Sequence, residues 1–112
     1  MAHDDMHVLM YKVLAYLYSC MKSGREPDSA ALKANGPIFE GVPESYRTKI
    51  LMTLVERGYV TGIDVDGVDN ARFAIPIDPE ITFEGVEFMM ENTMMRKALK
   101  FLQDAKSALP FI

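Results

Sequence analysis

The sequence contains a single cysteine, Cys20, and no tryptophan. One cysteine cannot form an internal disulfide, so a chain of 112 residues must rely on packing, which suits a reducing, intracellular compartment. The longest apolar runs are interrupted by Lys12 and Ser19, well before the roughly 20 residues that a membrane-spanning helix needs. The N-terminal residues also lack the basic region of a signal peptide. We therefore expect a cytoplasmic protein that does not enter a membrane.

An excess of basic residues is also missing. The formal net charge is -4 and the isoelectric point is near 5.1. This balance gives no overall attraction to nucleic acid or to anionic lipid, so binding of either requires a local basic patch. The hydrophobic fraction of 49% is sufficient for one core, and we expect a single domain over residues 1–112.

Patterns typical of catalysis are absent from the sequence. It has no glycine-rich phosphate loop, no Ser-His-Asp arrangement and no paired-acid motif. His3 and His7 have the spacing of a helical metal pair, but no third ligand is evident. Cys20 lies in an apolar stripe with no histidine nearby, which favours a buried structural thiol over a nucleophile. We expect neither an enzyme nor a bound metal or cofactor.

What the sequence does contain is a strong helical pattern near its start, from about residue 4 to 22. Asp4 and Asp5 stand where the helix dipole favours negative charge. One apolar stripe consists of Met6, Leu9, Met10, Val13, Leu17 and Cys20. A second stripe consists of Tyr11, Leu14 and Tyr18. Because the helix is apolar around most of its circumference, we expect it to be covered on two sides.

Two more helices follow. Asp28 is a suitable N-cap for a short helix over about 29–35, which ends at Asn35 and Gly36. Pro43 and Gly58 frame a third helix over about 43–57. Two segments rich in β-branched and aromatic residues then predict a hairpin over about 59–77, in which Pro76 should place the return strand at a sheet edge.

The centre of that hairpin reads DVDGVDN, from Asp64 to Asn70, and holds three carboxylates. An EF-hand calcium loop requires an oxygen ligand at position 1 and a bidentate glutamate at position 12. With Gly67 at position 6, these places fall to Gly62 and Phe73, which lack the required side chains. Asp66-Gly67 is a common hairpin-turn pair, so we interpret the stretch as a turn.

The last part of the sequence predicts helices over about 82–92 and 93–109, the first capped by Thr82. The final helix carries a second apolar stripe, as the first helix does. This similarity suggests a partner surface and a homodimer built from both helices. The predicted interface consists of Tyr11, Leu14, Tyr18, Met94, Phe101 and Ala108.

The order of three helices, a hairpin and further helices is typical of a winged helix-turn-helix, an α+β and mostly helical fold. Three signals are more specific: the Gly58-Tyr59 junction, the T-x-x-G of Thr82 and Gly85, and the Glu91-Asn92 pair before the last helix. In this order they resemble the YjcQ family of small bacterial and phage-associated proteins. The resemblance covers most of the chain, implies a winged helix and a prophage or regulatory context, and supplies no catalytic residues.

Such a fold suggests a regulator that binds double-stranded DNA through its third helix and its wing. The candidate contacts are Lys33, Ser45, Arg47, Thr48, Lys49 and Arg72. The wing opposes this function, because Asp64, Asp66 and Asp69 outnumber Arg72 there and would be repelled by phosphate. The alternative is a winged-helix module that binds another protein through its methionine-rich and aromatic helical surface. The sequence leaves both functions open.

Overall fold

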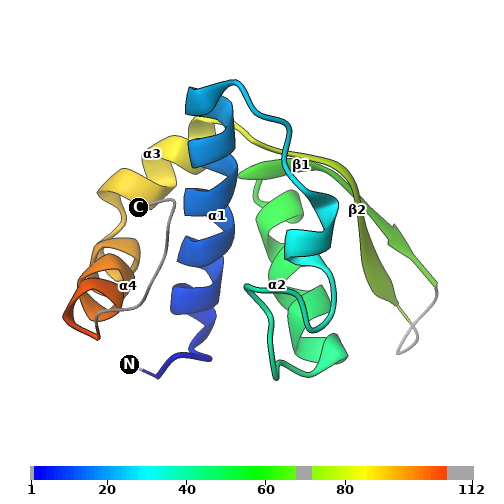
Figure 1. The fold of residues 1–112 in the computed structure, drawn as a ribbon, viewed down its shortest axis with the longest axis horizontal. Helices are drawn as coiled ribbons and strands as arrows, with labels where there is room; N and C mark the ends of the chain where they lie inside the picture. Colours follow the sequence, from blue (N-terminus) through cyan, green and yellow to red (C-terminus); the bar gives the residue numbers. More distant parts are fainter. Residues whose placement is uncertain (1, 68–71, 106–112) are drawn as a thin grey trace.

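The structure is a computed structural model that describes residues 2–67 and 72–105. Four α-helices, one 3-10 helix and one hairpin make up these residues (Figure 1). In chain order they are α1 (Met6–Ser23), the 3-10 helix η1 (Ser29–Leu32), α2 (Glu44–Glu56), β1 (Val60–Asp66), β2 (Phe73–Ile81), α3 (Phe83–Glu91) and α4 (Thr93–Asp104). The predicted class, α+β and mostly helical with one antiparallel hairpin, is confirmed.

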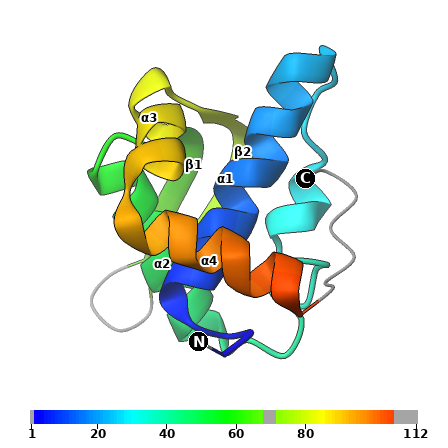
Figure 2. The same ribbon diagram turned by 90° about the vertical axis from the view of Figure 1, so that its left-hand side faces the viewer.

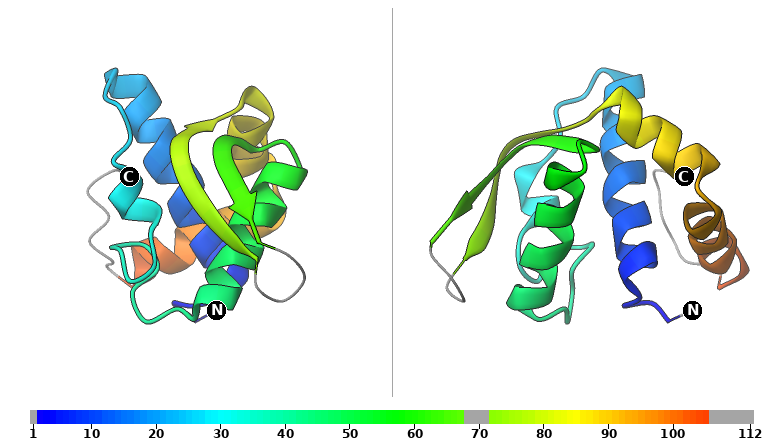
Figure 3. Two further views of the ribbon diagram at one scale, coloured as in Figure 1. Left: turned by 90° about the vertical axis from the view of Figure 1, so that its right-hand side faces the viewer. Right: turned by 180° about the vertical axis from the view of Figure 1, so that it is seen from behind.

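Helix α1 is the centre of the fold. Helices α3 and α4 lie on one side of it, and α2 with the hairpin lies on the other (Figures 1 and 3). Both of its apolar stripes are consequently used inside the chain, and Cys20 is buried with them. The prediction that this helix is covered on two sides is confirmed. Its buried residues are Val8, Leu9, Met10, Tyr11, Val13, Leu14, Ala15, Leu17 and Cys20.

The second predicted helix is much shorter than expected. Asp28 does cap it, accepting a hydrogen bond from the amide of Ala30 at 2.9 Å, but η1 ends at Leu32 instead of continuing to residue 35. The backbone of Lys33 is extended, with φ -77° and ψ 165°, and Asn35 has φ 58°. The chain therefore turns two residues before the Asn35-Gly36 signal that was expected to end a helix.

The hairpin extends past the predicted end at residue 77, because β2 continues to Ile81. The pairing of Thr61 with Glu80 and of Ile63 with Pro76 leaves additional residues on β2 between these pairs. Gly62 makes this irregularity possible: its φ is 77°, and a Cβ at this position would collide with the carbonyl of Asp78. Both strands of this two-stranded sheet are edge strands, which suits Pro76.

Alternation along β2 directs its small residues inward. Ala74 and Pro76 are buried, whereas Phe73, Ile75 and Ile77 are 42%, 38% and 64% exposed. The small inward side chains allow the backbone of β2 to approach α2, where a side chain from that helix reaches the carbonyl of Ala74. A row of large apolar side chains consequently stays on the outer surface of the hairpin.

Two of the three family signals, Gly58-Tyr59 and the T-x-x-G of Thr82 and Gly85, meet at one joint. Thr82 Oγ1 donates to the carbonyl of Gly58 at 2.5 Å and accepts from the amide of Gly85 at 3.0 Å, so it caps α3 and ties it to the end of α2. A Cβ on Gly85 would collide with the carbonyl of Tyr59, whose ring stacks on Phe88 with centroids 4.2 Å apart. Because this joint fixes the direction of α3, the family signals have a structural role here.

Asn92 performs the same task between α3 and α4. Its side chain accepts hydrogen bonds from the amides of Met94 at 2.9 Å and Met95 at 3.2 Å. The cap separates two helices that follow each other directly, and it turns α4 back across α1 (Figure 2). A groove lies where α1 and α4 cross.

Candidate functional site

The predicted DNA-contacting helix corresponds to α2, and Arg47 on this helix is only 3% exposed. Its Nε donates to the carbonyl of Leu32 at 2.7 Å, and its terminal nitrogens donate to Glu44 at 2.7 Å and to the carbonyl of Ala74 at 3.1 Å. The guanidinium thus joins η1, α2 and β2, and it also lies 6.0 Å from the ring centre of Phe39. In this structure Arg47 cannot reach a phosphate, which corrects its predicted role.

Thr48 is the second predicted contact that the structure buries, at 4% exposure. Its hydroxyl donates to Glu44 Oε1 at 3.3 Å, the same oxygen that accepts from Arg47. Its predicted contact with the major groove of DNA is therefore corrected, because a buried hydroxyl that already has a partner is not presented to DNA. Periodicity along α2 did not reveal this burial, since polar residues were assumed to face outward.

The other four predicted contacts are exposed: Lys33, Ser45, Lys49 and Arg72. They do not lie on one element. Only Ser45 and Lys49 share α2, whereas Lys33 follows η1 and Arg72 precedes β2. Exposed carboxylates lie between them in the sequence, namely Glu40, Glu44, Glu56, Asp64 and Asp66.

The predicted dimer interface is only partly available. Tyr11 and Leu14 are buried within the chain, because α1 packs against α4 on one side and against α2 and β2 on the other. Their assignment to an interface is therefore corrected. Tyr18, Met94 and Phe101 are partly buried, and the Phe101 ring meets His3 edge to face at 5.0 Å. Ala108 lies outside the described residues.

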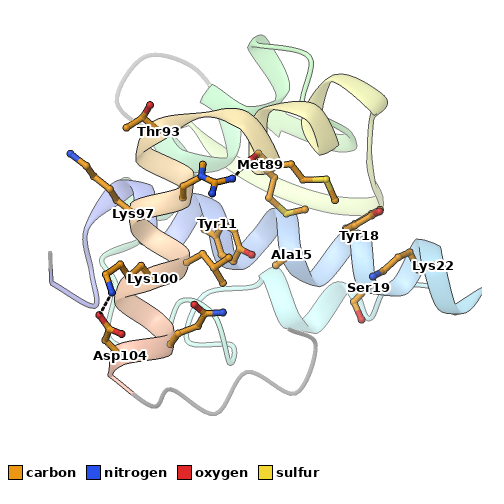
Figure 4. A pocket seen from close by; sticks show the side chains of 14 residues that line it. Tyr11, Ala15, Tyr18, Ser19, Lys22, Met89, Thr93, Lys97, Lys100 and Asp104 are labelled. Carbon is orange, nitrogen blue, oxygen red and sulfur yellow. Dashed lines mark hydrogen bonds and ion pairs between the residues drawn. The ribbon is translucent and has the colours of Figure 1, made fainter.

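A groove of about 1020 Å³ lies where α4 crosses α1, with the end of α3 as its third side. Figure 4 shows α1 contributing a row of side chains from Tyr11 to Lys22 and α4 contributing another from Thr93 to Asp104. The apolar lining comes from Tyr11, Ala15, Tyr18, Met89, Met90 and Leu99. The polar lining comes from Ser19, Lys22, Thr93, Arg96, Lys97, Lys100, Gln103 and Asp104. We call this surface the basic groove.

Its charge is opposite to that of the whole chain. Among the described residues, four cations line the groove, at Lys22, Arg96, Lys97 and Lys100, against the carboxylate of Asp104. Asp104 accepts from Lys100 at 3.2 Å, and both side chains are largely exposed, so this ion pair is weak and leaves the lysine accessible to a partner. Lys22 lies 4.8 Å from the ring centre of Tyr18. The result is a positive, partly apolar depression on a protein of net charge -4.

The outer side of the hairpin has the opposite character. Phe73, Ile75 and Ile77 form its apolar row, and Asp66 and Asp64 are paired with the first two on β1. All five residues are exposed. We call this surface the acidic hairpin face. In Figure 1 the hairpin and α4 lie at opposite ends of the molecule, with α1 between them.

Sequence reasoning missed both surfaces for different reasons. The charges of α4 were visible at Arg96, Lys97 and Lys100, but only the crossing of two distant helices makes a groove beside them. The apolar alternation of β2 was also visible, yet which of its faces is buried depends on the neighbours of the strand. Tyr11 illustrates the combined effect: it belongs to the core, lines the groove, and has its pKa raised by burial.

The described part of the chain contains neither a cluster of metal ligands nor a membrane-spanning helix. Within residues 2–67 and 72–105, no three histidine, cysteine or acidic side chains come together as metal ligands would. None of the helices described is long and apolar enough to cross a membrane.

Comparison with known proteins gave one result. Neither the curated proteins nor the solved structures contain a match to this chain. The family model described as YjcQ protein matches residues 11–108, nearly the whole chain and every helix and strand from within α1 to α4. The chain therefore belongs to the YjcQ family.

Proposed function

We propose that this protein is a winged-helix interaction module that binds another protein in its basic groove. The order of α1, η1, α2, the hairpin and the C-terminal helices supports the winged-helix description. The observation that carries the function is the groove itself, with four cations around an apolar floor on an acidic chain. Such a surface combines apolar area for affinity with charge for the choice of partner.

Two methionines of the C-terminal helices, Met89 and Met90, line the groove. Tyr18 is the partly exposed tyrosine of the lining, whereas Tyr11 and Met89 are buried in the core. Methionine side chains are flexible and polarisable, and tyrosine combines apolar area with a polar tip, so both suit a protein interface. Met90 is exposed, which leaves apolar area available for a partner.

A direct test compares two charge-reversed variants in affinity capture from the native host. The groove variant carries Lys97→Glu and Lys100→Glu, and the matched α2 variant carries Lys49→Glu and Arg57→Glu, with the same change in net charge. All four side chains are exposed. We expect a protein that is captured by the wild type and the α2 variant but not by the groove variant. Loss with the α2 variant alone would overturn the proposal.

DNA binding is the second candidate function. The observation in its favour is the exposure of Ser45 and Lys49 on the helix that would enter the major groove. Against it stand the burial of Arg47 and Thr48 and the exposed Asp64 and Asp66 on the hairpin. Fluorescence anisotropy on random and host duplexes at two salt concentrations tests it. Low-salt binding that is lost with Lys49→Glu would make DNA the ligand.

A further inference from the structure

We infer that the basic groove accepts the acidic hairpin face of a second copy of this chain, so that copies associate head to tail. This inference rests on the proposed function and names a partner for the groove. It is carried by two surfaces of opposite charge on one molecule: Lys22, Arg96, Lys97 and Lys100 around the groove, and Asp64 and Asp66 on the hairpin.

The apolar parts of the two surfaces match as well as the charges. Phe73, Ile75 and Ile77 project from β2 in a row, and Ile77 is the most exposed of them. In water such a row is unfavourable, and contact with the apolar floor of a groove would bury it. The carboxylates of Asp64 and Asp66, on the neighbouring strand, would then lie among the groove lysines.

A symmetric dimer through the groove is less favourable than head-to-tail association. In a two-fold contact the same surface meets itself, so the four cations of one groove would face the four cations of the other. Like charges brought together in this way repel each other and disfavour the contact. The acidic hairpin face excludes self-contact for the same reason. Pairing groove with hairpin avoids both repulsions.

The positions of the two surfaces determine the form of the assembly. The hairpin and α4 lie at opposite ends of the molecule, on either side of α1 (Figure 1). A contact between unlike surfaces at opposite ends leaves one free groove and one free hairpin on every pair. Association therefore continues beyond the dimer unless the rotation between copies closes a ring.

Sedimentation velocity on the full chain over a concentration series tests this inference through a charge swap. The groove variant is Lys97→Glu with Lys100→Glu, and the hairpin variant is Asp64→Lys with Asp66→Lys. Matched controls reverse the same charges elsewhere, at Lys49 with Arg57 and at Glu26 with Glu40, all exposed. We expect the wild type to associate at low salt and less at high salt. Each test variant alone should associate at least about tenfold more weakly, and the controls should not.

Mixing the two test variants is the decisive step, because their reversed surfaces are complementary to each other. The inference requires the mixture to associate more strongly than either variant does alone. A wild type that remains monomeric, variants that associate as the controls do, or a mixture that stays monomeric would each overturn it. Affinity capture tests the proposed function separately. If the wild type captures a different protein and the groove variant does not, that function stands even where the chain itself is monomeric.

Discussion

The Nε of Arg47 donates a hydrogen bond to the carbonyl of Leu32 at 2.7 Å, across 15 residues of sequence. This contact, with those to Glu44 and the carbonyl of Ala74, makes a charged side chain of α2 part of the interior. The helix that a winged fold would offer to DNA thus has its N-terminal arginine committed to structure. The binding function that we propose lies at the other end of the molecule, in the basic groove.

Replacing Arg47 tests its structural role. We expect Arg47→Ala to lower the free energy of unfolding by about 3 kcal/mol, because two buried carbonyls lose a charged donor. Arg47→Lys should recover little of this, since one ammonium cannot span three acceptors on three elements. Urea unfolding measures the loss. The matched control is Lys49→Ala, an exposed change on the same helix that should stay within about 0.5 kcal/mol of wild type. Equal stability of the two variants would contradict this role.

For the substitution Gly85→Ala, helix propensity and packing predict opposite changes in stability. Helix propensity alone predicts that Gly85→Ala stabilises α3 by up to about 1 kcal/mol. The close approach of the Tyr59 carbonyl predicts the reverse, a loss of about 1 to 3 kcal/mol from overpacking at the joint. Thermal or urea unfolding decides between them. A more stable variant would show that the joint has more room than the structure indicates.

A substitution at Ile77 should affect self-association without affecting the stability of the fold. Because the side chain is 64% exposed, Ile77→Ser should change the free energy of unfolding by no more than about 0.5 kcal/mol. The same substitution removes an apolar group from the acidic hairpin face, so self-association should weaken. Val60→Ser is a useful contrast, because Val60 is buried and its loss should reduce stability instead. Unchanged association of Ile77→Ser in sedimentation would contradict the role of the apolar row.

Two tyrosines with raised pKa values predict a loss of stability at alkaline pH. Burial raises the pKa of Tyr11 above its ordinary value of 10.0, and burial raises the pKa of Tyr46 too, with help from Asp5 and Asp4. The unfolded chain therefore releases these protons first, so the stabilisation is complete below pH 10.0 and falls as pH rises through the folded pKa values.

Lys12 acts in the opposite direction, because burial lowers its pKa below 10.5 and its charging penalty is relieved as pH rises to that value. Urea unfolding on both sides of pH 10.0 should show a net decrease that is smaller in Tyr11→Phe. The same slope in that variant would exclude Tyr11 as a source.

Local patterns predicted the elements well, because periodicity, caps and turn pairs act over a few residues. The double stripe of α1 correctly indicated two-sided cover, and Thr82 caps its helix as the sequence suggests. The predictions that were wrong concern residues whose burial depends on contacts between segments far apart in the sequence. Tyr11 and Leu14 are apolar whether a neighbouring chain or α4 covers them, and Arg47 is polar whether it meets phosphate or the carbonyl of Leu32.

The central claim is that a partner binds in the basic groove. The most direct test is to find which backbone amides a bound partner protects from hydrogen exchange. Hydrogen exchange with mass spectrometry should be measured on the full protein with and without the protein recovered by affinity capture. Docking in the basic groove predicts slower exchange in peptides covering residues 11–22 and 89–104, and unchanged exchange in residues 44–57. Protection confined to residues 44–57 would contradict the claim and return the function to α2.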